Sequence, residues 1–204
     1  MNRTILIFAL MLLLPMVSMG QDSKLQKKEV RKQAKGLMKE GWRVNPDALS
    51  LEEQLESSYF FHTKLDESNN PVYLTTTSAE TAQNYALARS KAITFAIGNL
   101  ANLLVEEEKM NGVMNSPAAA WHTDWYRITI QQNTNNINIL TPDDLQMQIN
   151  YLQPSVTPEL GALQVVLDLH RVLADGQVEV MIVLAAAKQE VIDYFNQYAS
   201  RRNK

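Results

Sequence analysis

A hairpin signal in the last quarter of the sequence most limits the folds open to this chain. Asp175-Gly176 is a residue pair typical of two-residue β-hairpin turns. It separates two β-prone runs, Val165–Val172 and Val178–Leu184, in which large apolar residues recur at every second position. The competing interpretation is one helix that begins at Thr157-Pro158-Glu159 and ends at Ala174. The β-branched content and the Asp-Gly turn favour the hairpin, so we expect an antiparallel sheet.

A long alanine-rich segment predicts the main helix. Ser78 is expected to cap a helix of about Ala79–Lys109, after a short strand over Val72–Thr77. One row of this helix carries only small side chains, namely Ala88, Ala92 and Ala96. Small residues let a helix approach a sheet or another helix closely. Gly98 fits the same close approach, at a cost of about 1 kcal/mol relative to Ala.

Amphipathic spacing and capping signals predict three further helices. The first spans Ser23–Glu40 and stops at Gly41. The second follows Ser50, which Glu53 completes into a capping box. Its buried stripe is expected to hold Leu51, Leu55, Ser58 or Tyr59, His62 and Leu65. The last helix carries Val191, Tyr194, Phe195 and Tyr198 on its apolar face.

Residues 117–132 have two interpretations. Ser116-Pro117 is typical of a helix start, and Trp121, Trp125 and Ile128 follow at helical spacing. The alternative is a strand over Trp125–Ile130, which is aromatic and β-branched. We favour the helix. Two short strand candidates follow, at residues 137–140 and 146–152.

The composition agrees with an ordinary globular protein, since 46% of the residues are apolar and 20% are charged. Together the elements predict an α+β fold with an alanine-ridged central helix and further helices packed on a small antiparallel sheet. We expect one such domain over residues 44–204, preceded by a basic N-terminal helix at residues 21–43.

Residues 1–20 have the layout of a secretory signal peptide. Arg3 precedes an uncharged apolar core at Ile5–Val17, and Ser18-Met19-Gly20 places small residues at the −3 and −1 positions of a cleavage site. The alternative, an uncleaved membrane helix, is shorter than the roughly 20 apolar residues that a span needs. We therefore expect export to the periplasm or the cell surface, with Gln21 as the first mature residue and no transmembrane segment in the mature chain.

Charge is segregated along the expected mature chain. Residues 21–43 carry eight Lys or Arg and three Asp or Glu, a net charge of +5. The whole chain has a net charge of −3, so residues 44–204 carry −9 once Arg3 is set aside. Five pairs of like charge lie four residues apart in the basic helix: Lys24/Lys28, Lys27/Arg31, Lys28/Lys32, Arg31/Lys35 and Lys35/Lys39. They oppose helix formation by roughly 1–2.5 kcal/mol.

An acidic counterpart is expected to offset this repulsion. It is either the acidic remainder of the protein, with solvent and salt, or an external polyanion such as anionic lipid headgroups or a cell-wall polymer. The candidate contact residues are Lys27, Lys28, Arg31, Lys32 and Lys35. A second candidate surface is an aromatic patch of Trp121, Trp125 and Tyr126, although aromatic residues at helical spacing usually belong to the core.

The common catalytic signatures are missing. The sequence has no Gly-x-Gly-x-x-Gly, Walker, Gly-x-Ser-x-Gly or His-Glu-x-x-His motif, and it has no cysteine. His62, His122 and His170 are far apart in sequence, and metal sites usually need three or four suitably spaced ligands. We therefore predict no catalytic residues, no metal and no cofactor. The absence of a strongly basic domain argues against a nucleic-acid partner.

Several segments resemble exported proteins of known families. The Ser18-Met19-Gly20/Gln21 junction, the helix end Lys39-Glu40-Gly41-Trp42-Arg43-Val44 and the segment Ser50-Leu51-Glu52-Glu53-Gln54-Leu55 resemble uncharacterised exported envelope proteins of Bacteroidetes-type bacteria. Residues 88–96 and 175–180 are similar to small envelope domains, including the twenty-kilodalton envelope lipoproteins and the N-terminal domain of flagellar assembly protein T. The chain lacks the lipidated cysteine of the lipoproteins. The resemblance implies an envelope structural or interaction role and supplies no catalytic residues.

These observations lead to one functional prediction with two alternatives. We expect a non-enzymatic exported envelope protein that binds a protein partner or an envelope polymer through the basic helix. One alternative is a structural homo-oligomer subunit, joined through exposed strand edges or the alanine ridge. The other is a small hydrolase without a known motif, which a pocket lined by His62, His122 or His170 with carboxylates would indicate.

Overall fold

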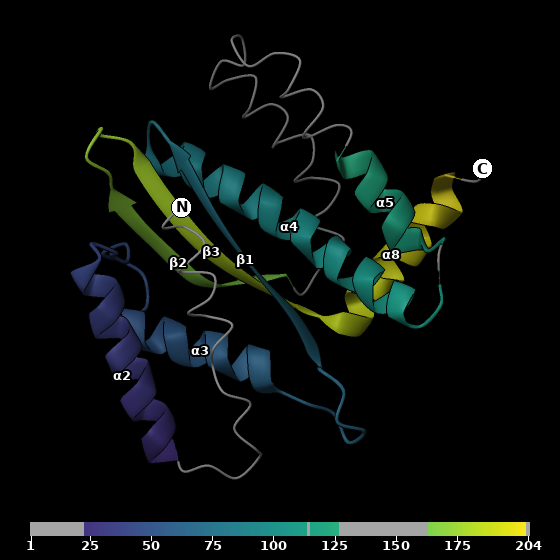
Figure 1. Ribbon diagram of the computed structural model, residues 1–204, viewed down its shortest axis with the longest axis horizontal. Helices are drawn as coiled ribbons and strands as arrows, with labels where there is room; N and C mark the ends of the chain where they lie inside the picture. The colour runs from purple at the N-terminus through teal and green to yellow at the C-terminus, as the bar shows by residue number, and fades with distance from the viewer. Residues whose placement is uncertain (1–22, 114, 127–162, 203–204) are drawn as a thin grey trace.

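The computed structural model describes residues 23–113, 115–126 and 163–202 (Figure 1). Within these residues, three strands form an antiparallel sheet in the order β1-β3-β2. The strands are β1 (Tyr73–Ala82), β2 (Gln164–Val172) and β3 (Val178–Ala187). The helices are α2 (Ser23–Lys39), α3 (Leu51–Thr63), α4 (Tyr85–Met110), α5 (Pro117–Tyr126) and α8 (Lys188–Arg202). The predicted α+β class is confirmed.

The hairpin signal was read correctly, and β2 and β3 are joined at Asp175-Gly176. Gly176 has a φ of +82°, which a residue without a Cβ adopts without strain. The Leu173 amide donates to the Gln177 carbonyl at 2.8 Å, and the Gln177 amide donates to Asp175 Oδ1 at 3.0 Å. The helix alternative for this segment is therefore wrong.

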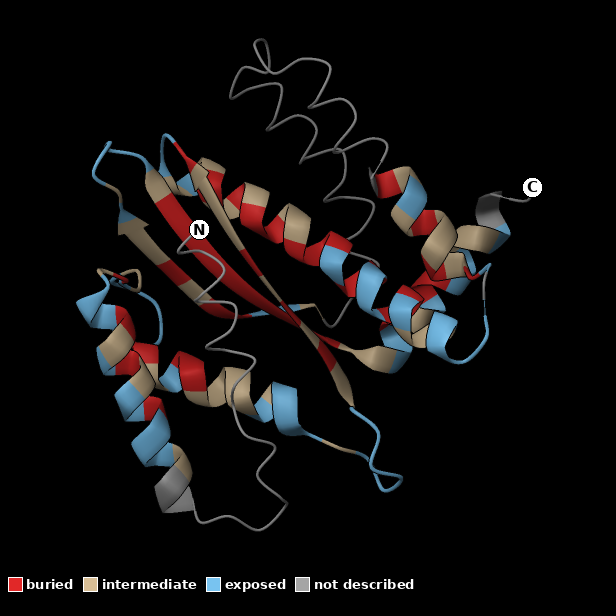
Figure 2. Ribbon diagram, in the orientation of Figure 1, coloured by how far each residue is buried: buried red, intermediate tan, exposed pale blue. Residues whose placement is uncertain are grey.

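Helices cover both faces of the sheet, so the molecule has three layers (Figure 1). The central strand β3 is almost entirely buried, as Figure 2 shows. Successive side chains of a strand point to opposite faces. Val180, Ile182, Leu184 and Ala186 therefore join one core with α4, α5 and α8. Met181, Val183 and Ala185 join a second core with α2, α3 and β2.

The long helix begins later than predicted. Residues 79–82, expected to be helical, belong to β1 and pair with residues 178–181 of β3. Asn84 caps α4 instead of Ser78, and its side chain accepts a hydrogen bond from the Leu87 amide at 2.9 Å. The inward face of β1 holds the buried polar residues Thr76 and Ser78, and Thr76 Oγ1 donates to the Ala96 carbonyl at 2.9 Å. A strand with polar inward residues shows no hydrophobic alternation, which explains the error.

The close approach predicted for the alanine-rich helix is present. Ala88, Ala92 and Ala96 are each 0% exposed in the core between α4 and the sheet. Gly98 lies against α5, where an added Cβ would meet the Trp125 ring at 2.4 Å. Glycine is thus required at this position by packing.

The other expected helices are present at α2, α3, α5 and α8. Ser116 caps α5, and its Oγ accepts a hydrogen bond from the Ala119 amide at 3.1 Å. The helix interpretation is therefore correct for residues 117–126. The expected signal peptide at residues 1–20, residues 127–132 and both strand candidates at 137–140 and 146–152 lie outside the described residues.

Candidate functional site

The basic helix α2 is held in the structure by its apolar side. Val30, Ala34 and Leu37 are spaced for one helix face, and all three are buried in the second core. The helix ends because Gly41 takes a φ of +92°, after which the Trp42 amide donates to the Leu37 carbonyl at 3.0 Å. These three apolar residues of α2 are thus packed inside the protein.

The segment after α2 fastens the helix to the edge strand β2. Trp42 is fully buried, and the Arg171 guanidinium lies 4.5 Å from the centre of its ring. Arg171 also pairs with Glu179, with 2.6 Å between Nε and Oε2. Arg43 and His170 exchange two backbone hydrogen bonds, of 2.8 and 2.9 Å, in an isolated antiparallel bridge. These contacts fix the direction in which α2 presents its remaining side chains.

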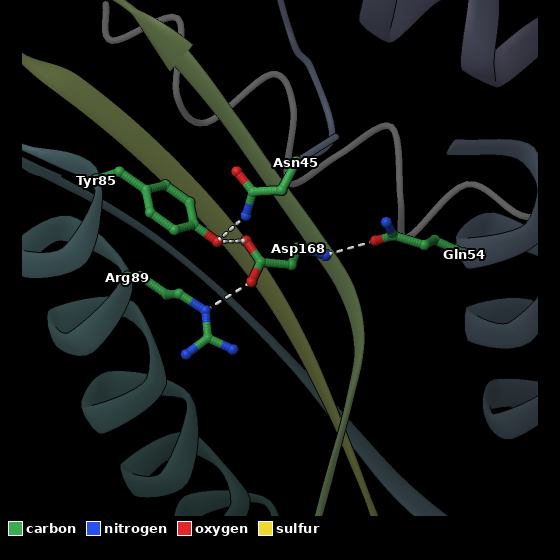
Figure 3. Close-up of polar contacts among 5 residues, drawn as sticks. All are labelled: Asn45, Gln54, Tyr85, Arg89 and Asp168. Atoms are coloured by element: carbon green, nitrogen blue, oxygen red, sulfur yellow. Dashed lines mark hydrogen bonds and ion pairs between the residues drawn. The ribbon is translucent and has the colours of Figure 1, made fainter. Parts of the chain in front are cut away.

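A polar network at Asp168 joins the two helical layers across the edge of β2 (Figure 3). Tyr85 Oη donates to Asp168 Oδ1 at 2.8 Å, and Arg89 Nε lies 2.6 Å from Asp168 Oδ2. Asn45 Nδ2 donates to Tyr85 Oη at 2.6 Å. Asn45 follows α2, whereas Tyr85 and Arg89 belong to the first turns of α4. We call Asn45, Tyr85, Arg89 and Asp168 the Asp168 network.

The polar groups of the Asp168 network are hydrogen-bonded to one another, and these contacts shift the pKa values of Tyr85 and Arg89. Burial raises the pKa of Tyr85, and its hydrogen bond to Asp168 and the charge of Asp168 raise it further. Burial alone would lower the pKa of Arg89, but the hydrogen bond and the charge of Asp168 outweigh it, so this pKa lies above its ordinary value. Both Asp168 oxygens are occupied, and the arrangement favours holding elements together over acid–base chemistry.

Gln54 belongs to the same region and was missed in the sequence. It lies buried on α3, where its Oε1 accepts a hydrogen bond from the Asp168 backbone amide at 2.8 Å and its Nε2 donates to the Leu49 carbonyl at 2.8 Å. Gln54 and the Arg43–His170 bridge therefore form hydrogen bonds with backbone groups on the free edge of β2. Its position between Leu51 and Leu55, on the side of α3 expected to be buried, was the sequence signal that could have identified it.

All five predicted contact residues lie on the exposed side of α2. We call Lys27, Lys28, Arg31, Lys32 and Lys35 the basic face. Lys28, Lys32 and Lys35 lie opposite the buried stripe, and Lys27 and Arg31 lie on its flank. Arg31 is 3.6 Å from Glu52 of α3, and Lys32 is 3.9 Å from Glu29 of its own helix. These exposed pairs contribute about 0–1 kcal/mol each.

The other three cations of the basic face, Lys27, Lys28 and Lys35, have no acidic group within 4.0 Å in the described part of the chain. The acidic remainder of the protein supplies one carboxylate to this face, that of Glu52, within the same residues. Among the described residues, acidic groups from outside α2 therefore offset little of the repulsion between these cations.

The three histidines do not converge. His62, expected in a buried stripe, is exposed, and its Nδ1 lies 2.9 Å from Thr75 Oγ1. The expectation was wrong because the buried stripe of α3 ends at Leu55. His122 stacks on Trp125 in α5, and His170 contacts the edge of Tyr85 at a centroid distance of 5.3 Å. No group of three His, Cys, Asp or Glu that could hold a metal ion occurs among the residues described.

The aromatic residues proposed as a surface patch belong to the core. Trp121 and Trp125 are 5% and 7% exposed and contact Phe195 and Phe95, respectively. The patch prediction is therefore wrong for both tryptophans, whose helical spacing reflects packing. Tyr126 ends α5, and its side chain lies outside what the structure describes.

No protein-family model matches the chain, and no curated protein or solved structure is significantly similar to it. In the described residues, no helix has the length and apolar character needed to cross a membrane.

Proposed function

We propose that this chain is a non-enzymatic exported protein of a bacterial cell envelope, and that it binds an anionic envelope polymer or surface through the basic face of α2. One observation carries the proposal: the basic face is exposed, and three of its five cations lack an acidic partner among the described residues. The expected signal peptide and the resemblance to envelope proteins support the location.

The repulsion within α2 supports an external counterpart. The like-charged pairs oppose the helix by roughly 1–2.5 kcal/mol, and nearby surface pairs return about 0–1 kcal/mol each. A polyanion that contacts several of these cations would remove the repulsion when it binds. A role in binding would thus explain why α2 keeps like-charged residues that lower its stability.

The makeup of the basic face favours a polyanion over a folded protein partner. Protein–protein interfaces usually centre on buried aromatic or apolar residues, with charges at the rim. Among the residues described, the exposed side chains of α2 are charged, apart from Met38 near its end. Its partner is best matched by a flexible or planar array of negative charges, in which binding energy comes from charge neutralisation.

Two alternatives receive less support. The alanine ridge is buried against the sheet, so one of the two surfaces suggested for a homo-oligomer is not available. A hydrolase site would need histidines and carboxylates to converge, and the three histidines instead lie on α3, α5 and β2. Asp168 and His170 both belong to β2, and the Asp168 carboxylate is engaged by Tyr85 and Arg89.

The proposal is tested by matched charge removal. The double variant Lys28→Gln/Lys35→Gln removes two unpaired cations from the basic face. The control variant Lys91→Gln/Lys109→Gln removes the same charge from α4. Both are compared with the unmodified chain from Gln21 onward, which retains every described contact, in co-sedimentation with cell-wall sacculi and with vesicles containing anionic lipid.

We expect salt-sensitive binding by the unmodified chain and by the control. At about 1 kcal/mol for each cation near an anionic surface, the double variant should bind roughly thirtyfold more weakly. Equal binding by the two variants, or no binding of the unmodified chain to either material at low salt, would overturn the proposal.

A further inference from the structure

Among the described residues, the exposed large apolar side chains of the helical layers form two groups, one in each layer. Met38, Leu49 and Phe60 belong to α2, α3 and their connection, in the layer that carries the basic face. Leu103, Met110 and Val113 lie at the end of α4, beside the acidic run Glu106–Glu108. An anionic surface would attract the basic face in the first layer and repel the acidic run in the second.

Phe60 is the largest of these side chains and is held in place. It lies on the side of α3 opposite the buried residues Leu51 and Leu55, and it is 50% exposed. Its ring contacts Phe61 edge-on at a centroid distance of 5.4 Å and lies 6.4 Å from Tyr73. Phe61 and Tyr73 are themselves 4.7 Å apart, which completes an aromatic cluster at the end of α3. An exposed phenyl ring supported in this way needs little ordering on contact with a partner.

The two helices present their outer sides together. Arg31 of the basic face reaches Glu52 of α3, so the flank of α2 adjoins the outer side of α3. Met38 lies seven residues after Arg31 and therefore on the same flank. Figure 2 shows exposed residues along much of α2 and at the end of α3 that carries Phe60.

We propose that the layer of α2 and α3 docks onto an anionic lipid surface, with the basic face at the headgroups and Phe60 entering the interfacial region. This inference rests on the proposed function and names the partner of the same site. Peripheral binding to a membrane depends on two contributions together, attraction to anionic headgroups and burial of apolar surface. Binding to a charged polymer in water would use only the electrostatic attraction. This layer provides cations and also exposed apolar side chains.

The buried stripe of α2 determines how such docking works. From its sequence, α2 resembles an amphipathic helix that could lie in a membrane with its apolar side in the lipid. Val30, Ala34 and Leu37 are already buried in the protein, so insertion of α2 would require unpacking the second core. The apolar contact must come from exposed side chains next to the helix, and Phe60 is the largest available.

Of the three carboxylates of α3, one is paired with a cation, one is hydrogen-bonded and keeps its charge, and one has no described partner. Glu52 faces Arg31, and Glu53 is held in the capping box, where Ser50 donates to its Oε2 from both its amide at 2.8 Å and its hydroxyl at 2.6 Å. Glu56 lies between these residues and Phe60 on the outer side of the helix. Its charge opposes docking, so Glu56→Gln should strengthen binding to an anionic surface.

The test uses the chain from Gln21 onward and vesicles of phosphatidylcholine with or without phosphatidylglycerol. Phe60→Ala should weaken binding to phosphatidylglycerol-containing vesicles roughly three- to tenfold, because it removes a large apolar group. Met110→Ala, which truncates a side chain that is 81% exposed beside the acidic run, should leave binding unchanged. Neither change touches the buried stripe of α2.

A second measurement locates Phe60 directly. The sequence has no cysteine, so Phe60→Cys and Met110→Cys can each carry one environment-sensitive fluorophore. We expect a blue shift on addition of phosphatidylglycerol vesicles at residue 60 and none at residue 110.

The failures of the two proposals are distinguishable. If Lys28→Gln/Lys35→Gln loses binding to sacculi, while vesicles are not bound or residue 60 shows neither effect, the lipid proposal is overturned and the polyanion proposal stands. If the charge variant binds both materials as the unmodified chain does, both proposals are overturned.

Discussion

The two helical layers on the sheet are built differently. The layer of α4, α5 and α8 is joined to the sheet by close side-chain packing, with fully buried alanines and an aromatic ring seated on a glycine. The layer of α2 and α3 also shares a core with the sheet. In addition, hydrogen bonds of Arg43 and Gln54 join it to the backbone of β2. The Asp168 network connects Asn45, which follows α2, with Tyr85 and Arg89 of α4.

The difference shows which surface is free to take part in binding. The layer of α4 contains two ion pairs of its own, Lys109 with Glu106 and Lys188 with Glu107. The layer of α2 leaves cations without partners in the described residues while its apolar side is buried. The layer of α4, α5 and α8 is thus built mainly for packing. In the layer of α2 and α3, α2 packs with one side and carries positive charge, unpaired within the described chain, on its exposed side.

The same substitution in each layer should have opposite effects on stability. Gly98→Ala places a Cβ where the Trp125 ring lies within 2.4 Å, and Gly36→Ala in α2 places one where no atom lies within 4 Å. Overpacking should lower the free energy of unfolding by about 1–3 kcal/mol for Gly98→Ala. Gly36→Ala should raise it by up to about 1 kcal/mol, because Ala favours the helix.

Urea unfolding of both variants measures the contrast. If Trp125 causes the loss, Gly98→Ala should cost less stability in a Trp125→Leu background than in the unmodified chain. A stabilising effect of Gly98→Ala would show that α5 does not pack on α4 as described.

Removing charge from the basic face should stabilise the protein while weakening its binding. Lys28→Gln/Lys35→Gln eliminates four of the five like-charged pairs in α2. At about 0.2–0.5 kcal/mol per pair, the free energy of unfolding should rise by roughly 1 kcal/mol at low salt and less at high salt. The Lys91→Gln/Lys109→Gln control removes the same charge without this gain. Equal stability changes in the two variants would mean that the cations of α2 do not repel one another appreciably.

The parts of the fold that were predictable from sequence depended on local signals. The Asp175-Gly176 hairpin, the Ser50–Glu53 capping box and the stop at Gly41 each follow from the chemistry of a few adjacent residues, and all three are present. The inward residues Thr76 and Ser78 hid the second half of β1, because strand pairing with β3 buries both and Thr76 is hydrogen-bonded to α4. Such partners are distant in sequence and cannot be read from periodicity.

The candidate site was predictable only in part. The exposed cations of α2 were found because a charge run opposite an apolar stripe indicates a solvated face. The tryptophans were misassigned as a surface because exposure is a property of the assembled layers. Phe60 and Gln54 were missed for the same reason, since one is exposed on a helix rich in apolar residues and the other is buried as a polar partner of β2.

The contribution of the Asp168 network to stability should fall at alkaline pH. The pKa of Tyr85 is raised above its ordinary value of 10.0, first by burial and then by its contact with Asp168. Below pH 10.0 the phenol is neutral in both the folded and the unfolded chain, and its contribution to stability is fully present. As the pH rises toward the folded-state pKa, the unfolded chain loses the proton first, so stability falls.

Tyr85→Phe removes this titration, and its free energy of unfolding should depend less on pH than that of the unmodified chain between about pH 9 and pH 11. Tyr59→Phe, which changes a tyrosine of α3 outside the Asp168 network, provides the matched control and should retain the unmodified slope. The effect is the smallest of those expected here, because the hydroxyl is only partly buried. If the slopes of the unmodified chain and of Tyr85→Phe coincide, the Tyr85 hydroxyl does not stabilise the Asp168 network as described.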